Sequence, residues 1–423
     1  MASPAPWTEM FTRALAVADG EIAGLIQSQR LQNEATVNLV ASESYCPRAT
    51  LEAEACALIN KNSSGYPPRR TLGGSDILDR IENLANERAR RLFGAEHANC
   101  QALSSTIANI AVVRALVPKG GRILSFDPAA GGHSSHGGRG HVSGQDYEVR
   151  HFGVIEETGE IDYAAAAETA RNFRPAMIVA GSSAYPGIVG FARLHEIAQE
   201  ASALLLADIA HVCGLVVAGL HPDPVPLCDV VTTSTHKTLC GPRTGGLMLC
   251  RQRHAKSIDE ALMPGLQAAA GGHIIAARAV LFEQVRQPAF RELMRAVVAN
   301  ARVLADELVR AGLRLFGGGT ETHMVVVDLR DGDLDAGEVN RRLFRHAIVA
   351  NTVRLPARES QPGRLGLRLG STAMTIRGAG GENFAHLARA VAAVLAQAAN
   401  GVEDAGISAQ VKRIAARYPI PFQ

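Results

Sequence analysis

An alternation of short apolar runs with amphipathic helical patterns, between residue 51 and about residue 275, constrains the fold most. A strand that is apolar throughout is buried on both faces, because an exposed face would need polar residues at every second position. The pattern therefore predicts a mostly parallel sheet with helices on both faces, which is an α/β fold. The candidate strands are Arg122–Phe126, Ala176–Ala180, Ala203–Ala207, Asp229–Thr232 and Gly246–Cys250.

Helical patterns and two later apolar runs indicate the domain organisation. Residues 76–93 and 106–116 are predicted helices, and residues 273–312 are helical in pattern with a break expected near Gln287-Pro288, where proline interrupts the hydrogen bonds. Two further apolar runs, Met324–Leu329 and Gly366–Leu369, are predicted strands. We expect an N-terminal arm (1–50), a large domain (51–300) and a smaller C-terminal α+β domain (301–423).

Composition excludes several classes of function. Lys plus Arg (43) nearly equals Asp plus Glu (41), and aromatic residues make up 4%, so we expect neither a nucleic-acid surface nor a basic membrane surface. The seven cysteines form no C-x-x-C pair, which argues against a disulfide frame or a zinc site, and we expect no metal. No signal peptide is evident, and the most apolar stretch, residues 203–220, contains Asp208 and His211. These features indicate a cytoplasmic protein.

The segment Asp229–Gly246 carries the strongest chemical signal. A buried strand leads into a hydroxyl-rich turn that presents His236 and Lys237. A lysine amine can form an imine with the aldehyde of pyridoxal 5′-phosphate (PLP), and nearby donors can bind its phosphate. Taken alone, a loop lysine is most often a solvated surface residue, so the interpretation needs support from other segments.

Asp208 provides such support. It follows the apolar run 203–207, which places it at the sheet edge where ligands bind in α/β folds. A carboxylate there can hold the pyridine nitrogen of PLP in its protonated form, although it can equally cap the next helix. His211 can face the same pocket or can be a core histidine.

Three more segments suit a phosphate, a planar ring and a carboxylate. Ser104 and Ser105 precede a predicted helix, where hydroxyls and free amides bind phosphate or simply cap the helix. His133 lies in the glycine-rich stretch 131–138 and can stack on a ring, unless the stretch is a flexible turn. Arg368 interrupts an apolar strand, and it can clamp a substrate carboxylate or lie exposed on an edge strand.

Together, these segments resemble the serine hydroxymethyltransferases, which are PLP-dependent transferases of fold type I. The resemblance extends from about Val37 to Gly378 and includes Leu39–Glu43, Asn60-Lys61, Gly65–Pro67, Leu92–Asn99, Ala184–Pro186, Asp208–His211, Gly214–Pro222, Thr235–Thr238, Met263–Gln267 and Arg368–Gly370. It implies transfer of a hydroxymethyl unit between tetrahydrofolate and an amino acid. It also implies a homodimer or a dimer of dimers with shared active sites.

The resemblance assigns roles to the motif residues. Lys237 would carry PLP, Asp208 would hold its pyridine nitrogen and His133 would stack on its ring; with His211 they are the implied catalytic residues. The other implied cofactor contacts are Ser104 and Ser105 at the phosphate, Ser183 and His211 near the phenolic oxygen, and Thr235 and His236. The implied substrate residues are Arg368, Ser42 and Tyr66, and Asn351 lies in a stretch that resembles a folate-binding part of the family.

One stretch departs from the family pattern Asn-Lys-Tyr-Ala-Glu-Gly-Tyr-Pro, two variable residues, then Arg-Tyr-Tyr-Gly-Gly. Asn62 replaces the first tyrosine, Ser64 the glutamate, and Thr71 and Leu72 the paired tyrosines. In the family the glutamate transfers a proton, a role worth about 10²–10⁴ in rate, and the tyrosines line the substrate and folate site. Residues 263–272 also differ from the family's Gln-Gly-Gly-Pro.

The cofactor-holding positions are thus retained, whereas the substrate-facing positions have changed. This predicts hydroxymethyl transfer from methylenetetrahydrofolate to glycine, or to an α-substituted acceptor such as alanine, giving α-methylserine. The alternatives are a folate-independent β-hydroxy amino-acid aldolase or threonine transaldolase, and a non-catalytic PLP-binding protein.

Overall fold

The structure, a computed structural model, describes residues 5, 7–332, 334–356, 365–397 and 404–421. Its centre is a seven-stranded sheet with the order β4-β10-β9-β8-β7-β5-β6. All neighbours from β9 to β6 are parallel, and β10 is antiparallel to both β9 and β4. The strands are β4 (His97–Asn99), β5 (Arg122–Phe126), β6 (Glu148–Phe152), β7 (Met177–Gly181), β8 (Leu204–Asp208), β9 (Val230–Ser234) and β10 (Gly246–Cys250).

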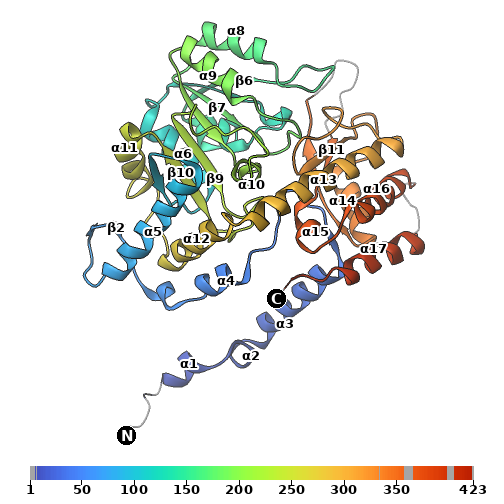
Figure 1. Cartoon of the computed structure of the whole chain (residues 1–423), viewed down its shortest axis with the longest axis horizontal. Coiled ribbons are helices and arrows are strands. Elements are labelled where there is room, and N and C mark those ends of the chain that lie inside the picture. Colours follow the sequence, from blue (N-terminus) through green and yellow to red (C-terminus); the bar gives the residue numbers. More distant parts are fainter. Residues whose placement is uncertain (1–4, 6, 333, 357–364, 398–403, 422–423) are drawn as a thin grey trace.

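Both faces of this sheet are covered, because successive strand residues enter different cores. In β10, Leu247 and Leu249 belong to one core, whereas Met248 and Cys250 belong to another. Helices α6 (Ser105–Leu116) and α11 (Gln252–Leu262) supply the second core. The first core is supplied by α5 (Asp76–Phe93), α8 (Tyr163–Phe173), α9 (Phe191–Glu200), α12 (Gly272–Gln284) and part of α13 (Pro288–Arg310). The predicted α/β fold with a mostly parallel sheet is confirmed (Figure 1).

A second, smaller body is built on the antiparallel sheet β11-β14-β13. Its strands are β11 (Met324–Asp328), β13 (Asn351–Arg354) and β14 (Leu365–Gly370), and its helices are α14 (Ala336–Arg345), α15 (Thr372–Ile376), α16 (Gly381–Ala396) and α17 (Ala405–Arg417). The long helix α13 belongs to both bodies, since Met294 lies in the core of the large one and Leu304 in the core of the small one. The boundary predicted at residue 300 falls inside this helix and remains a prediction.

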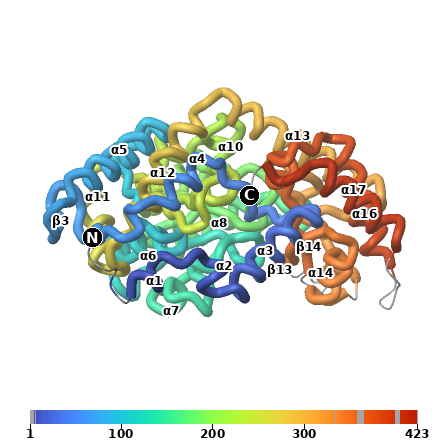
Figure 2. Tube along the Cα trace, turned by 90° about the horizontal axis from the view of Figure 1, so that it is seen from below, coloured from blue at the N-terminus to red at the C-terminus, as the bar shows by residue number. Residues whose placement is uncertain are grey.

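The N-terminal arm consists of α1 (Thr8–Thr12), α2 (Leu15–Ala18) and α3 (Gly20–Ala35). Figure 1 shows α1 and α2 standing clear of both bodies, and Figure 2 shows the same arm from below. The arm is held at the C-terminal end of α3 and just beyond it. Arg377 donates to the carbonyls of Asn33, Glu34 and Thr36 at 3.4, 3.2 and 2.8 Å. The next segment, β1 (Val37–Asn38), pairs in parallel with β12 (Ile348–Val349). Among the described residues, no helix is long and apolar enough to cross a membrane.

Shorter elements complete the chain, and two strands of the seven-stranded sheet, β4 and β6, were not expected. The short elements are α4 (Arg48–Glu54), α7 (Val142–Gln145), α10 (Cys213–Val217), β2 (Gly65–Tyr66), β3 (Arg69–Arg70) and the 3₁₀ helices 57–60, 128–130 and 134–136. The predicted break near Gln287-Pro288 is confirmed, since α12 ends at Gln284 and α13 begins at Pro288. Strands β4 and β6 are the two edges of the sheet, and β6 carries polar residues such as Arg150 and His151, so neither has the apolar pattern of a central strand.

Candidate active site

Asp208 is the last residue of β8. It therefore lies at the carboxyl end of the parallel strands, where the sequence predicts that a ligand binds. One carboxylate oxygen accepts hydrogen bonds from Asn109 Nδ2 at 2.7 Å and from His136 Nε2 at 3.0 Å. The other accepts from the Ala210 backbone amide at 3.0 Å. Burial by itself would raise the pKa of Asp208, but the hydrogen bonds and the positive charges of His136 and Lys237 outweigh it and hold the pKa well below its usual range. Asp208 is therefore a buried, ionised carboxylate.

Lys237 lies in the turn that follows β9, three residues beyond its last residue, Ser234. Its amine forms no hydrogen bond with any residue that the structure describes, so it is free to react. Burial lowers the pKa of this amine to about 8, with Arg368 and Arg243 contributing in the same direction and Asp208 opposing. A larger fraction of Lys237 is thus neutral near neutral pH than of an ordinary lysine.

A network of polar side chains at the carboxyl ends of the strands orients Asp208. Asn109 of α6 donates both to Asp208 and to the Ser135 hydroxyl, the latter at 2.9 Å, and it accepts from the Thr232 hydroxyl at 2.6 Å. His133 Nδ1 lies 2.8 Å from the same Ser135 hydroxyl, and burial lowers the pKa of His133 to about 4. The structure thereby brings His133 into the Asp208 cluster. No sequence motif predicts the contacts of Asn109 or His136 with Asp208; the only signal for Asn109 is a single amide within an apolar helix.

The residues predicted for phosphate lie at the N-terminus of α6. Ser104 is the N-cap, and its hydroxyl accepts from the Ile107 amide at 3.1 Å, while Ser105 begins the helix. Two nearby segments contain buried nitrogens without a hydrogen-bond partner among the described residues, namely His236 Nδ1 and Arg278 Nε. Arg278 is fully buried, and its other nitrogens donate to backbone carbonyls, including those of Ala102 and Thr244 at 2.9 Å each.

Arg368 of β14 comes from the small body and is 7% exposed. Its guanidinium donates to Asn351 Oδ1 at 3.1 and 3.3 Å and to the Ser183 carbonyl. Within the described ranges no carboxylate is paired with it, and burial lowers its pKa to about 10. A buried cation with only neutral partners is a suitable place for an anionic group.

The other predicted residues divide into two sets. Ser183 lies beside the glycine-rich stretch and donates to the Gly132 carbonyl at 2.8 Å. Burial lowers the pKa of His211 well below its usual value, and the positive charges of Lys237 and Arg368 lower it further. Thr235 is buried two residues before Lys237, and its hydroxyl donates to the Pro242 carbonyl at 3.0 Å. No described hydrogen bond connects the Ser42 side chain to the cluster. Tyr66, in contrast, is hydrogen-bonded to the Asp259 carbonyl at 2.9 Å and to Asn99 Nδ2 at 3.0 Å, and none of its described contacts reaches the Lys237 cluster.

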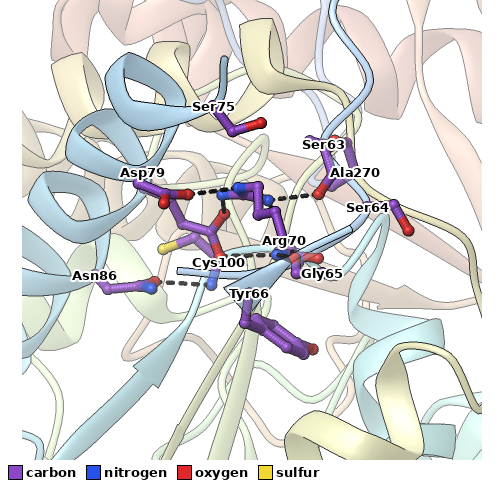
Figure 3. Close-up of polar contacts among 12 residues, drawn as sticks. Ser63, Ser64, Gly65, Tyr66, Arg70, Ser75, Asp79, Asn86, Cys100 and Ala270 are labelled. Carbon is purple, nitrogen blue, oxygen red and sulfur yellow. Dashed lines mark hydrogen bonds and ion pairs between the residues drawn. The ribbon is translucent and has the colours of Figure 1, made fainter. Parts of the chain in front are cut away.

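The segment that departs from the family pattern is held by a buried ionic network (Figure 3). Arg70 forms ion pairs with Asp79 and Glu82, both at 2.5 Å, and donates to the carbonyls of Ser63 and Gly65. The Ser63 hydroxyl donates to the Ala270 carbonyl, which ties this segment to residues 263–272. The two departing segments therefore form one unit.

The substituted side chains of this segment do not take part in that network. The Ser64 side chain points away from Arg70 in Figure 3, and Asn62 accepts from the Ser64 backbone amide at 2.9 Å. Thr71 and Leu72 are exposed. Across the described part of the chain, no group of three or more His, Cys, Asp and Glu side chains is placed to hold a metal ion.

Comparison with known proteins relates this chain to one family. The family model for serine hydroxymethyltransferase matches residues 15–391. A serine hydroxymethyltransferase from Myxococcus xanthus (strain DK1622) is 41% identical over 409 residues, which are 96% of this chain and 98% of that protein.

Proposed function

Because this chain belongs to the serine hydroxymethyltransferase family, we propose that Lys237, Asp208 and Arg368 are the centre of its active site. The enzyme is a PLP-dependent transferase of one-carbon metabolism that uses tetrahydrofolate as cosubstrate. The observation that carries the assignment is the juxtaposition of a reactive amine, an ionised buried carboxylate and a buried arginine without a carboxylate partner.

The residues present fit PLP. Lys237 offers an amine with a pKa of about 8 for the aldehyde, and Asp208 offers a negative charge for a protonated ring nitrogen. The α6 N-terminus at Ser104 and Ser105, and the unpartnered nitrogens of His236 and Arg278, offer donors to a phosphate. A phosphate would thus supply hydrogen-bond partners that these buried nitrogens lack within the described chain.

Each residue has a task in the proposed reaction. Bound PLP supplies an electron-accepting ring next to Cα of the amino acid. Asp208 would hold the ring nitrogen in its protonated form, and His133 would lie against the ring. Arg368 binds the α-carboxylate and so orients Cα, and the Lys237 amine can take up or return the Cα proton.

We further propose that the acceptor is glycine or an α-substituted amino acid such as alanine. In the family the positions of Ser64, Thr71 and Leu72 hold a glutamate and two tyrosines that line the substrate site, so the shorter side chains here would leave more room for the acceptor. The Arg70 network and the Ser63–Ala270 hydrogen bond fix the backbone that carries them, so the added space is not lost by collapse of the segment.

An acceptor assay tests this proposal. The enzyme is incubated with methylenetetrahydrofolate and either glycine or alanine, and serine or α-methylserine is measured by mass spectrometry. We expect folate-dependent product from at least one acceptor. Acetaldehyde release from threonine without folate, at a rate above hydroxymethyl transfer, would instead indicate an aldolase or transaldolase. A PLP absorbance without exchange of the glycine or alanine α-proton into deuterated solvent would indicate a non-catalytic protein.

The pH dependence of cofactor capture checks the assignment of Lys237. Only the neutral amine attacks an aldehyde, so the rate at which PLP binds to cofactor-free protein should rise with pH and level off above a midpoint near 8. Stopped-flow absorbance between pH 6 and 10.5 measures this rate. A rate that keeps rising toward pH 10.5, as for an ordinary lysine, would contradict the assignment.

We also propose a homodimer in which the arm covers a second copy of the chain. Several large apolar side chains of the arm are exposed, including Trp7 (64%) and Phe11 (77%), and the described residues of the same chain leave them uncovered. Burying each such side chain contributes about 1.5–3 kcal/mol. Removing residues 1–18 should therefore raise the dimer dissociation constant at least about tenfold.

Sedimentation velocity measures this effect over a range of concentrations. The matched control is Phe344→Ser, which removes a 49% exposed apolar side chain from α14 of the small body and should leave the dissociation constant unchanged. Equal dimer dissociation constants for the shortened chain and the full chain would show that the arm does not contact the second copy. A cytoplasmic location belongs to the same proposal, and the seven free cysteines are consistent with a reducing compartment.

A further inference from the structure

Two buried histidines, His211 and His323, are in contact beside Lys237. His211 Nδ1 and His323 Nε2 are 3.4 Å apart, and the ring centroids are 5.6 Å apart with an angle of 23° between the planes. The distance between the ring centres is longer than the distance between the two nitrogens by nearly twice the distance from a ring centre to its own nitrogen. Both nitrogens therefore lie close to the line that joins the ring centres. The rings therefore meet edge to edge and nearly coplanar, as in an N–H···N hydrogen bond, and do not stack face to face.

The neighbouring carbonyl decides which nitrogen carries the proton. His323 Nε2 is also 3.2 Å from the Ala41 carbonyl oxygen, which can only accept a hydrogen bond. His323 must then be protonated at Nε2, and its contact with His211 is a hydrogen bond only if His211 Nδ1 accepts. Burial lowers the pKa of His323 to about 3 and that of His211 well below its ordinary value, so both rings are neutral. The remaining proton of His211 is consequently at Nε2.

The surroundings of the pair keep this arrangement rigid. The Ala41 carbonyl is fixed where the chain packs against β14, since the Gly370 amide donates to the Leu39 carbonyl at 2.7 Å and a side chain at Gly370 would meet Ala41 Cα at 2.4 Å. The His323 carbonyl accepts from the Ser371 amide at 3.0 Å, and the His211 carbonyl accepts from the Thr238 hydroxyl at 2.8 Å.

We propose that His323 is a positioning residue that fixes His211 as the Nε2–H tautomer, so that His211 acts as a hydrogen-bond donor toward an oxygen bound beside Lys237. The proposal rests on the proposed function, in which that oxygen is the phenolic oxygen of PLP. The positive charges of Lys237 and Arg368 favour an anionic oxygen at this place, and a ring nitrogen with a lone pair would repel it. No sequence motif had pointed to His323.

The test is a long-range ¹H–¹⁵N NMR spectrum of the full chain labelled at histidine, recorded with and without PLP. The His211 signals are assigned from their loss in His211→Gln. We expect His211 Nδ1 at the shift of an unprotonated nitrogen in the natural chain and in His323→Gln, whose amide retains an N–H donor. In His323→Leu the donor is gone, and the Nδ1 signal should move toward the protonated position. In the PLP-loaded protein, the absorbance spectrum between pH 6 and 9 should change in His323→Leu and not in His323→Gln.

A matched control is His346→Leu, which removes another buried histidine, from the end of α14, and should leave the His211 signals in place. A protonated His211 Nδ1 in the natural chain, or identical His211 signals in His323→Leu and the natural chain, would overturn the proposal. Because the tautomer is read in the cofactor-free chain as well, this result is independent of hydroxymethyl transfer. Absence of transfer with the expected tautomer would instead count against the proposed function.

Discussion

Replacing Lys237 with alanine is expected to abolish the visible absorbance of lysine-bound PLP and to lower turnover by about 10²–10⁴-fold, the range for losing a group that transfers a proton. The Lys237 amine interacts with the charge of Asp208. Its pKa of about 8 lets it act both as nucleophile and as base. Difference absorbance of the PLP-loaded protein and initial rates of hydroxymethyl transfer measure the two effects.

The matched control for Lys237 is Lys256→Ala. The Lys256 side chain is 85% exposed and lies on α11, where its loss should change neither the absorbance nor the rate. If Lys237→Ala retained both the absorbance and the turnover of the natural chain, the assignment of the cofactor lysine would be wrong, and the roles of Asp208 and Arg368 would have to be reconsidered with it.

Replacing Arg70 with methionine is expected to lower the free energy of unfolding by about 3–5 kcal/mol, because breaking a buried ion pair leaves an uncompensated charge. The side chains of Arg70 and Glu82 are each 1% exposed. Burial raises the pKa of Glu82, while hydrogen bonds from Gln101 and Arg70 oppose the rise, so losing Arg70 would raise this pKa further. The destabilisation should therefore be smaller at pH 5 than at pH 7.5, where Glu82 must be charged.

Denaturant unfolding of the cofactor-free protein at both pH values measures this effect. The double variant Arg70→Met, Glu82→Leu removes both charges and should recover much of the lost stability, since an apolar pair of similar volume can replace a buried ion pair. Arg48→Met breaks an exposed pair with Glu52 and should change stability little. An Arg70→Met variant no less stable than Arg48→Met would show that the network does not hold the segment.

Local sequence patterns were sufficient to predict the central strands and the break between α12 and α13. The apolar runs of β5, β7, β8, β9 and β10 were located to within two residues, because burial on both faces leaves a continuous apolar pattern in the chain itself. Strands β4 and β6 escaped the same reasoning because edge strands tolerate polar residues on the side that faces solvent. The Ser104 cap was likewise predictable, since a cap acts on residues three positions away.

The sequence by itself determined the layered fold and the placement of Asp208 at a strand end, with Lys237 in the turn after the next strand, since these follow from residues adjacent in the chain. Only the tertiary structure decided what these residues contact. Asn109 reaches Asp208 across 99 positions, and His323 lies 112 positions from His211 and 282 from the Ala41 carbonyl. Periodicity reports which face of an element is buried, but a hydrogen-bond partner depends on which elements pack together, and that is settled only when the whole chain folds.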